Sequence, residues 1–363
     1  MFSNKAKEIA EACRFCWMCR HICPVGLVTG CEANTPRARG LLVSMDSRNI
    51  PLTADSTEIM YQCSLCGACT NDCATGYDPR VYTREGRTNA VVNGFVPERI
   101  QKVIDRAEAG KISGQPANEA LTAAVARLPK QAPVLLYLGE AAWRKGECAL
   151  AVMSLLEKAG VEYTVIKEEP DCGTHLGDLI GYVDEVRQMA ATCFEAMKAT
   201  GAATVIVLDP SYMAFIRHQC AQWEILPEAA FVTATAYCAQ LVKEGKLQPA
   251  QVGGTATYHD PCHLARDLDE TQPARDIIAA MGIELKEMFL NGKMSKCCGG
   301  PVMQQTNPDI TRQMAQARWA DAQFIGETKL ITACPCCGDI MGQTAPEGMQ
   351  HADLFQLLAE ACK

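Results

Sequence analysis

Two runs of four cysteines lie in the first eighty residues and share one spacing, C-x2-C-x2-C-x3-C. The first run ends in Cys-Pro and the second in Cys-Ala; the cysteines are Cys13, Cys16, Cys19 and Cys23, then Cys63, Cys66, Cys69 and Cys73. Three thiolates at intervals of three residues can bind three corners of an iron–sulfur cubane. In proteins with two such clusters, the fourth cysteine of each run binds the other cluster.

We therefore predict two [4Fe–4S] clusters and carry the crossed assignment over from that pattern. One cluster takes Cys13, Cys16, Cys19 and Cys73, and the other takes Cys63, Cys66, Cys69 and Cys23. Structural zinc is the alternative, but it uses C-x2-C pairs separated by a loop, which two complete runs fit poorly. Trp17 and Met18 are expected to pack against the first cluster and exclude water. Cys31 fits neither run and is expected to be a small buried residue.

A second cysteine set lies near the C-terminus. Cys262 stands in YHDPCHLAR, Cys297 and Cys298 in KCCGGP, and Cys334 and Cys337 in TACPCCGD. The intervals are 34 residues between Cys262 and Cys297 and 35 between Cys298 and Cys334. A zinc site and a metal-free redox dithiol are the alternatives to a cluster here.

Both cysteine sets resemble one known family over essentially the whole chain. Its helical two-cluster ferredoxin domain is similar to CRFCWMCRHICPVG, NTPRAR and CSLCGACTNDC. Its cysteine-rich CCG domain is similar to the C-terminal set. The family comprises iron–sulfur subunits of heterodisulfide reductase, anaerobic glycerol-3-phosphate dehydrogenase and lactate or glycolate oxidation. The resemblance implies a third [4Fe–4S] cluster, cubane or noncubane, with the ligands Cys262, Cys297, Cys298, Cys334 and Cys337.

The sequence around these five cysteines suits such a site. Each motif follows a predicted strand or lies in a loop, where α/β sheets place ligand sites. Gly299, Gly300 and Pro335 allow tight turns that bring backbone N–H groups to sulfur. Cys336 is not expected to be a ligand. For His259 and His263, a role beside the cluster and a satisfied core histidine are equally compatible with the sequence.

The elements that must position these cysteines divide into a helical part and an α/β part. Residues 1–105 are predicted to form a helical ferredoxin domain, and residues 106–132 a linker rich in Gly and Pro. Short apolar runs then alternate with amphipathic stretches, which favours βαβ units around mainly parallel sheets. The predicted strands are Val134–Leu138, Val161–Ile166, Thr204–Leu208, Ala256–Tyr258 and Leu330–Thr332. The predicted helices are Ala149–Lys158, Asp184–Thr200, Thr271–Met281 and Asp309–Phe324.

The α/β part repeats itself with a period of about 120 residues, which predicts two related CCG half-domains, 133–251 and 252–363. An alignment of Tyr137 with Tyr258 indicates that the first half is degenerate. Opposite the five C-terminal cysteines it has Ala141, Asp171, Cys172, Asp209 and Tyr212. One thiolate among five positions cannot hold a cluster, so we expect this half to be scaffold. The alternative is a mononuclear metal at Cys172, Asp171 and Asp209, with His175 nearby.

The composition of the chain indicates which binding partners and which cellular compartment are expected. The formal charge of −8 and the lack of a basic stripe argue against nucleic acid and anionic membranes. Twenty-one cysteines without an apolar leader argue against a secreted disulfide scaffold. No apolar run reaches the length of a membrane helix. We expect a soluble cytoplasmic protein that meets a membrane only through a partner. Cys148, Cys193, Cys220, Cys238 and Cys362 match no pattern and are expected to pack in the core.

The sequence has no nucleotide-binding motif, so the chain lacks a means of accepting hydride itself. We therefore expect the iron–sulfur electron-transfer subunit of a multi-subunit oxidoreductase, not catalytic on its own. It would take electrons from a flavoprotein dehydrogenase acting on a small substrate, such as a 2-hydroxy acid or methylated amine. It would pass them to a quinone, an electron-transferring flavoprotein or a ferredoxin-like carrier. The alternatives are a heterodisulfide reductase-type catalytic subunit that cleaves a disulfide at the CCG cluster, and an oxygen-sensing cluster protein.

Overall fold

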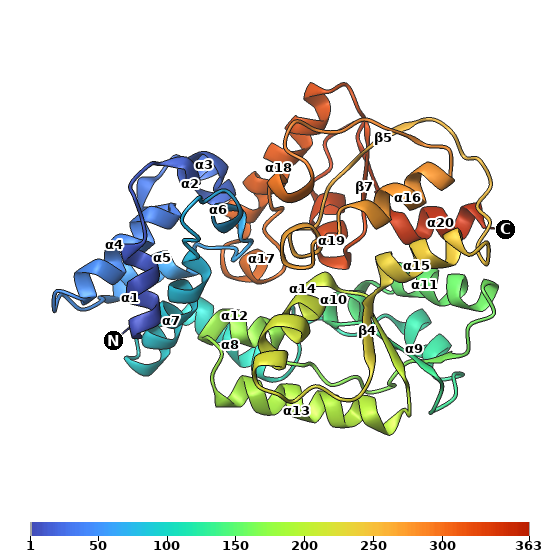
Figure 1. Ribbon diagram of the computed structural model, residues 1–363, viewed down its shortest axis with the longest axis horizontal. Coiled ribbons are helices and arrows are strands. Elements are labelled where there is room, and N and C mark those ends of the chain that lie inside the picture. The colour runs from blue at the N-terminus through green and yellow to red at the C-terminus, as the bar shows by residue number, and fades with distance from the viewer. Residues whose placement is uncertain (1, 363) are drawn as a thin grey trace.

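The computed structural model describes residues 2–362, which are mostly helical and include two small parallel sheets. Figure 1 shows the N-terminal helices as one lobe, with two sheet-containing lobes stacked beside it. The chain passes first through the helical lobe, then through the lower sheet lobe, and ends in the upper one. A helical cluster-binding region followed by an α/β region is the order that the sequence predicts.

Short helices built around the two cysteine runs make up the N-terminal lobe. Several begin with a proline in the first turn or a Ser, Thr or Asp side chain that caps the first N–H groups. The elements are α1 (Asn4–Glu11), α2 (Met18–Ile22), α3 (Pro24–Thr29), η1 (Glu32–Asn34), α4 (Pro36–Asp46), α5 (Ala54–Tyr61), α6 (Ala68–Asn71), α7 (Pro79–Val92) and α8 (Glu98–Glu108). Helices therefore fill the interval between Cys23 and Cys63.

Two buried arginines hold this lobe together around the second cysteine run. Arg39 donates to the carbonyl oxygens of Asn34 at 3.0 Å and Gln62 at 2.7 Å. Arg87 donates to the carbonyls of Met60 at 3.0 Å and Cys63 at 2.6 Å, and to that of Asp178 in the next lobe. Both arginines are 1% exposed. Their planar groups satisfy carbonyls that the short helices leave unpaired.

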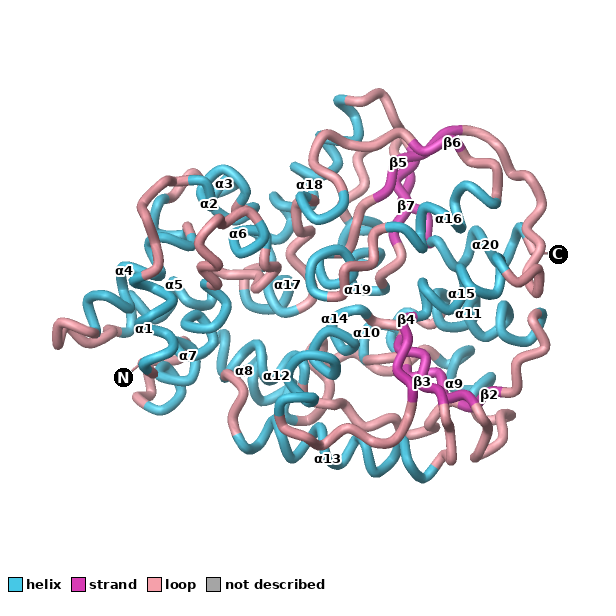
Figure 2. The backbone as a smooth tube through the Cα atoms, viewed as in Figure 1, coloured by secondary structure: helices cyan, strands magenta, loops and turns pink. Residues whose placement is uncertain are grey.

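The first sheet contains four parallel strands in the order β2-β1-β3-β4. The strands are β1 (Val134–Tyr137), β2 (Tyr163–Thr164), β3 (Thr204–Val207) and β4 (Ala230–Thr233). Its helices are α9 (Glu119–Val125), α10 (Glu140–Lys145), α11 (Glu147–Lys158), α12 (Thr174–Ile180), α13 (Asp184–Ala199), α14 (Pro210–Phe215), the π-helix η2 (Ile216–Cys220) and α15 (Ala234–Lys243). Figure 2 shows this sheet in the lower lobe, flanked by helices.

The second sheet is also parallel, in the order β6-β5-β7-β8. Its strands are β5 (Thr255–Tyr258), β6 (Glu284–Leu285), β7 (Lys329–Thr332) and β8 (Gln350–Asp353). Its helical elements are the π-helix η3 (His263–Asp267), α16 (Gln272–Ala280), η4 (Gly292–Met294), α17 (Val302–Thr306), α18 (Pro308–Phe324), α19 (Pro335–Gln343) and α20 (Leu354–Ala361). Strands β1 and β5 hold the same place in their sheets, as do β3 and β7.

All five predicted strands and all four predicted helices are present, with ends shifted by up to two residues. The sequence analysis missed the edge strands β4 and β8 and the two-residue strand β6. Strands β4 and β8 are exposed at their first residue and buried only at the last, so their apolar pattern is weak. The interval 106–132, predicted as a linker, contains α9, whose Leu121 and Val125 are buried in the core.

One hydrophobic core spans both sheet lobes and reaches α8. It includes Ile104, Leu135, Phe194, Ile277 and Phe355, all at most 2% exposed. Helix α20 packs against α11, and α16 against α15, so the last elements of the chain close the seam between the lobes. Arg144 and Lys145 form ion pairs with Asp339 across the same seam, both at 2.6 Å. The lobes are thus joined by shared apolar burial and not by a hinge alone.

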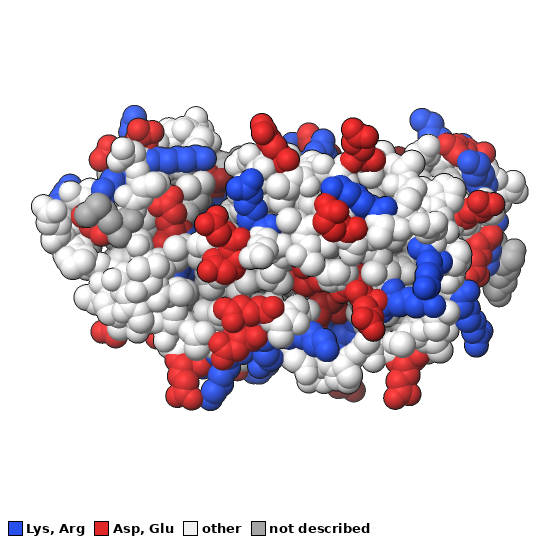
Figure 3. All heavy atoms as spheres, turned by 90° about the horizontal axis from the view of Figure 1, so that it is seen from below, with Lys and Arg blue, Asp and Glu red and all other residues white. Residues whose placement is uncertain are grey.

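The charged side chains show no continuous basic surface on the face in Figure 3, where lysines and arginines alternate with acidic residues. None of the helices within residues 2–362 has the length and apolar character needed to cross a membrane.

The three carbonyl contacts of Arg87 generate a stability prediction. The Arg87→Met substitution leaves these carbonyls without a donor inside the protein, which costs about 3 kcal/mol or more. The thermal unfolding midpoint, followed by circular dichroism under anaerobic conditions, should therefore fall clearly. Lys102→Met is the control, because Lys102 and Glu98 form an exposed pair of little value. Equal midpoints for the two variants would contradict this role of Arg87.

Candidate iron–sulfur centres

The two cysteine runs form the same local loop. Phe15 N–H donates to Cys13 Sγ and Leu65 N–H to Cys63 Sγ, both at 3.4 Å. Phe15 and Leu65 occupy the same position in their loops and have positive φ values of 54° and 53°. Two residues further on, Trp17 and Gly67 also have positive φ values, of 68° and 71°. In each loop, a backbone N–H group therefore points towards the sulfur of the first cysteine in the run. Gly67 suits this left-handed conformation, and Arg80 leaves no room for a Cβ there.

The second run and Cys23 surround one cavity. Its lining includes the four side chains Cys23, Cys63, Cys66 and Cys69, together with Arg39. Burial raises the pKa of Cys23 to about 11 and keeps that of Cys69 well above its usual value. Thiols in such a place lose their protons readily only when a metal cation compensates the charge. The cavity and its donor set thus fit a metal–sulfur group.

The first run lies closer to solvent. Cys16 is exposed, and Cys13, Cys19 and Cys73 are partly exposed. Cys13 and Cys73 pack against one apolar cluster that includes Phe2. Burial, reinforced by the neighbouring thiols of Cys13 and Cys23, raises the pKa of Cys19 to about 11.

Two expectations about this run are wrong. Trp17 and Met18 are 40% and 49% exposed and do not form a dry cover. The Arg37 guanidinium lies 3.8 Å from the Trp17 ring centroid and 4.9 Å from that of Phe15, which holds both rings at the surface. Cys31 is exposed instead of buried, because it follows the C-cap Gly30 at the end of α3.

The five C-terminal cysteines come together in the structure and are at most 7% exposed. Cys262 Sγ lies 3.9 Å from Cys297 Sγ, and Cys298 Sγ lies 3.4 Å from Cys337 Sγ. Cys334 caps α19 and accepts a hydrogen bond from Cys337 N–H at 3.5 Å. None of the cysteines in residues 2–362 forms a disulfide. Three chain segments thus bring thiols from β5, the 297–298 loop and β7 to one point.

The surroundings act differently on the five thiols: hydrogen bonds with neighbouring thiols, together with burial, raise the pKa values of Cys262 and Cys337 well above their usual value, whereas the pKa values of Cys298 and Cys334 are lowered. Gly299 N–H donates to Cys297 Sγ at 3.3 Å, as the predicted turn requires, and Gly299 has a φ of 97°. Hydrogen bonds from Cys297 and Cys337 lower the pKa of Cys298. Hydrogen bonds from Cys336 and Cys337 likewise lower the pKa of Cys334.

The second ferredoxin loop touches this C-terminal set. The Cys66 thiol shares a buried apolar cluster with Cys262 and Cys297, and the neighbouring Cys297 thiol, together with burial, raises the pKa of Cys66 well above its usual value. Arg266 donates from Nε to the Cys66 carbonyl at 2.6 Å, while its Nη2 is buried without a partner. The Nη1 atom holds the carbonyls of Lys293 and Ser295. A guanidinium therefore stands between the two thiol groups with one donor unused.

Two residues of the first sheet lobe, Ala141 and Asp209, lie against the C-terminal cysteines. Ala141 belongs to the same apolar cluster as Cys298, Cys334 and Cys337. Asp209 Oδ2 accepts a hydrogen bond from the Cys336 thiol at 3.0 Å. This contact joins residues 127 positions apart, and no feature of the sequence could have predicted it.

The alternative mononuclear site does not form. Within residues 2–362, the groups whose ligand atoms converge are His259, Cys298 and Cys337, and Asp209, Cys334 and Cys336. Tyr212 instead donates to Asp171 Oδ2, and Cys172 contacts Thr174 Oγ1 at 3.2 Å. His175 packs edge-on against the Tyr212 ring at 5.1 Å. Asp171, Cys172 and His175 therefore form core contacts and no ligand set.

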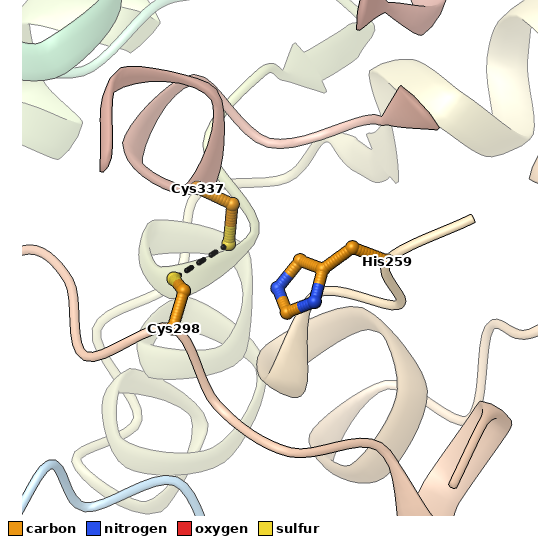
Figure 4. Close-up of side chains that lie close together, drawn as sticks. All are labelled: His259, Cys298 and Cys337. Carbon is orange, nitrogen blue, oxygen red and sulfur yellow. Dashed lines mark hydrogen bonds between the residues drawn. The ribbon is translucent and has the colours of Figure 1, made fainter. Parts of the chain in front are cut away.

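The two histidines beside Cys262 differ in their surroundings. Nδ1 of His263 lies 2.7 Å from Asp267, which itself pairs with Arg80 of the N-terminal lobe at 2.6 Å. Although burial opposes the charged form, the Asp267 contact raises the pKa of His263 to about 9. His259 is fully buried, and burial together with the Arg318 charge lowers its pKa to about 3. Figure 4 shows the His259 ring pointing towards Cys298 and Cys337.

Five cysteines that match no pattern are buried, as predicted, and all belong to the main core: Cys148, Cys193, Cys220, Cys238 and Cys362. Their thiols serve packing.

Comparison with known families assigns both cysteine regions. Residues 9–77 match the 4Fe-4S dicluster domain, and residues 256–341 match the cysteine-rich domain called CCG. The chain thus contains a 4Fe-4S dicluster domain and a cysteine-rich CCG domain, and its relatives include heterodisulfide reductase subunits. Both matches agree with the resemblance of the sequence, and they support iron–sulfur clusters in both regions.

Its relatives are iron–sulfur proteins of several oxidoreductase systems. The chain is 27% identical over 293 residues to a subunit of the dihydromethanophenazine:CoB–CoM heterodisulfide reductase of Methanosarcina acetivorans, and the match covers 77% of this chain and 71% of that protein. It is 28% identical to a probable membrane-anchored ferredoxin of Chromohalobacter salexigens, over 84% of this chain and 48% of the relative. It is 26% identical to the EtfAB:quinone oxidoreductase of Syntrophomonas wolfei, over 67% and 36%. The chain thus spans about half of the second relative and about a third of the third.

A buried histidine near α19 leads to a pH prediction. His351 lies against Gly338, and burial, with the nearby His259, lowers its pKa to about 4. A depressed histidine pKa favours the neutral folded state, so stability is complete above about pH 6.5 and falls as the pH drops towards 4. The fall is at most about 1.4 kcal/mol per pH unit, and less where the ring meets solvent.

His351→Met should therefore flatten the decrease of the thermal midpoint between about pH 6.5 and 4, measured by circular dichroism. The difference between variant and wild type at about pH 8 reports the packing change alone, since the ring is neutral there in both states. An unchanged acid slope would show that His351 is not a source of the pH dependence.

Proposed function

We propose that the chain is the electron-transfer subunit of a multi-subunit oxidoreductase. It would take electrons from a flavoprotein dehydrogenase and deliver them to a quinone, an electron-transferring flavoprotein or a ferredoxin-like carrier. Several relatives are named as subunits or enzymes of such systems, which supports partner proteins in general. Iron–sulfur clusters, when bound, supply one-electron transfer without hydride chemistry.

The proposed ligands form three sets. Cys13, Cys16, Cys19 and Cys73 would hold one cubane cluster, and Cys63, Cys66, Cys69 and Cys23 the second. Cys262, Cys297, Cys298, Cys334 and Cys337 would hold a third [4Fe–4S] cluster, cubane or noncubane. The cavity that Cys23 shares with the second run supports the crossed assignment. The convergence of the five buried C-terminal thiols supports the third set.

The single observation that carries this proposal is that Cys66 and Cys297 lie in the same buried apolar cluster. It makes the second set an immediate neighbour of the third, while the first set stands at the surface with Cys16 exposed. The three sets therefore form a series from solvent to interior. Such a series suits transfer between a docked protein and a buried centre.

The same series suggests where the flavoprotein meets the chain. Phe15, Trp17 and Met18 are 52%, 40% and 49% exposed beside Cys16. Left-handed backbone at bulky residues costs energy and is retained mainly at functional positions. We propose that these side chains meet the electron-donating partner.

We further infer that the two sheet lobes are related CCG halves of which the first has lost its cluster. The equal strand orders support this, and so do two matched positions: Asp209 caps α14 as Cys334 caps α19. The first lobe then acts as a cover, since Ala141 and Asp209 lie against the C-terminal thiols.

A catalytic role in disulfide cleavage is the second candidate, and the heterodisulfide reductase names of the relatives favour it. Two observations oppose it: the first half offers a single cysteine at the aligned positions, and the C-terminal cysteines are nearly inaccessible. A bulky disulfide could reach these thiols only if the segments that bury them moved apart.

Metal analysis tests the number of clusters. Protein purified anaerobically should contain about 12 iron atoms and as many sulfides per chain, for three clusters of four. Cys172→Ser should leave this value unchanged, because the aligned first-half positions offer no second thiolate. Cys298→Ser should lower it by up to about four. A reproducible value near about 16 would mean that the first half binds a cluster too.

Electron entry can be tested with two donors of different size. We expect Cys16→Ser to slow reduction of the C-terminal centre by reduced flavodoxin, since a protein donor must dock at the surface set. Reduction by photoreduced deazaflavin, a small donor, should change much less. Rapid freeze-quench EPR would follow the signal that Cys298→Ser removes.

Equal flavodoxin rates for wild type and Cys16→Ser would refute entry at the surface set. If the purified chain reduced a small disulfide with an artificial donor, and Cys298→Ala abolished this reaction, the catalytic candidate would replace the relay.

A further inference from the structure

His259 is a fully buried residue beside the C-terminal thiols. It follows β5, three residues before Cys262. A ring nitrogen of His259 and the Sγ atoms of Cys298 and Cys337 all lie within 4.8 Å of one another. Figure 4 shows the ring reaching from its backbone towards these two thiols. Its Nε2 atom is buried and has no hydrogen-bond partner in the protein.

The other ring nitrogen fixes which atom carries the hydrogen. Arg318 Nε lies 3.2 Å from His259 Nδ1, and both side chains are 0% exposed. A guanidinium has only N–H groups and cannot accept, so Nδ1 must accept this bond through its lone pair. The imidazole hydrogen is then on Nε2. A buried N–H donor without a partner therefore faces the thiol pair.

The ring is held rigidly in this position. His259 N–H donates to the Ile331 carbonyl at 2.9 Å, and Thr332 Oγ1 donates to the His259 carbonyl at 3.2 Å. Arg318 is itself held by Asp321 at 3.2 Å. Strand β7 thus fixes the backbone of His259, and α18 fixes the tautomer.

We propose that His259 is a positioning residue that donates its Nε2–H to a sulfur atom of the centre held by Cys298 and Cys337. The inference rests on the proposed C-terminal cluster and adds to it a residue that tunes the reduction potential. A hydrogen bond to sulfur stabilises the reduced, more negative state and so raises the potential. Without such an acceptor, the buried Nε2–H would stay unpaired, and buried donors in proteins are rarely left so.

His259→Leu and His259→Gln separate this role from packing. Leucine removes the donor, whereas the glutamine amide can still donate from a similar place. In redox titrations followed by EPR, His259→Leu should shift the C-terminal centre to lower potential, and His259→Gln should stay near wild type. The potentials of the two N-terminal centres serve as internal references and should not move.

His351→Leu is the matched control. His351 also has a buried, unpartnered Nε2, but it does not belong to a converging group of thiols within residues 2–362. Its replacement should leave the potential of the C-terminal centre unchanged. Equal shifts in His351→Leu and His259→Leu would overturn the proposal, as would a loaded His259→Leu protein with the wild-type potential.

Pulsed EPR on the wild-type chain, with ¹⁵N in the ε position of histidine, tests the contact even if His259→Leu fails to fold. A weak nitrogen coupling to the reduced C-terminal centre, lost in His259→Gln, is the expected result. Absence of coupling, or a strong coupling that indicates direct ligation, would overturn it. Iron and sulfide analysis reports separately on whether the C-terminal cluster is bound. If this cluster were missing, the proposed function would be refuted, whereas the assignment of the imidazole hydrogen to His259 Nε2 would stand.

Discussion

Burial of closely grouped cysteine sulfurs, and of the charge that they carry when deprotonated, is the constraint on which this structure depends. Charged groups in an apolar interior are costly unless opposite charges and hydrogen bonds accompany them. The chain meets this requirement with arginines: Arg39 and Arg87 in the N-terminal lobe and Arg318 behind His259 are buried, and Arg266 at the junction is partly buried. Each also ties loop carbonyls or a side chain into place. The same arginine side chains therefore supply positive charge near the cysteines and hold the surrounding loops in place.

The junction between the lobes is where these requirements meet. Arg80 pairs with Asp267, Arg84 with Asp178, and Arg266 holds the Cys66 carbonyl, so each bond joins the N-terminal lobe to a sheet lobe. Docking of the lobes thus depends on the same residues that surround the proposed ligands. We expect the spacing between the second and third centres to be set by this polar junction more than by apolar contact.

The first sheet lobe contributes side chains that lie beside the C-terminal cysteines. Asp209 meets Cys336, and Ala141 fills space beside Cys298. The two sheet lobes also share one hydrophobic core, in which α11 packs against α20.

The features that could be predicted from the sequence alone are local ones. Cysteine spacing indicated the two loops and the C-terminal set, and hydrophobic periodicity located five strands and four helices. Prediction failed where burial is decided by distant segments: the edge strands β4 and β8, the exposure of Cys31 and Trp17, and the helix α9 in the expected linker. The contacts of Cys66 with Cys297, of Asp209 with Cys336 and of Arg318 with His259 emerged only in the tertiary structure. They join residues 59 or more positions apart, and packing of whole lobes, not local propensity, brings such residues together.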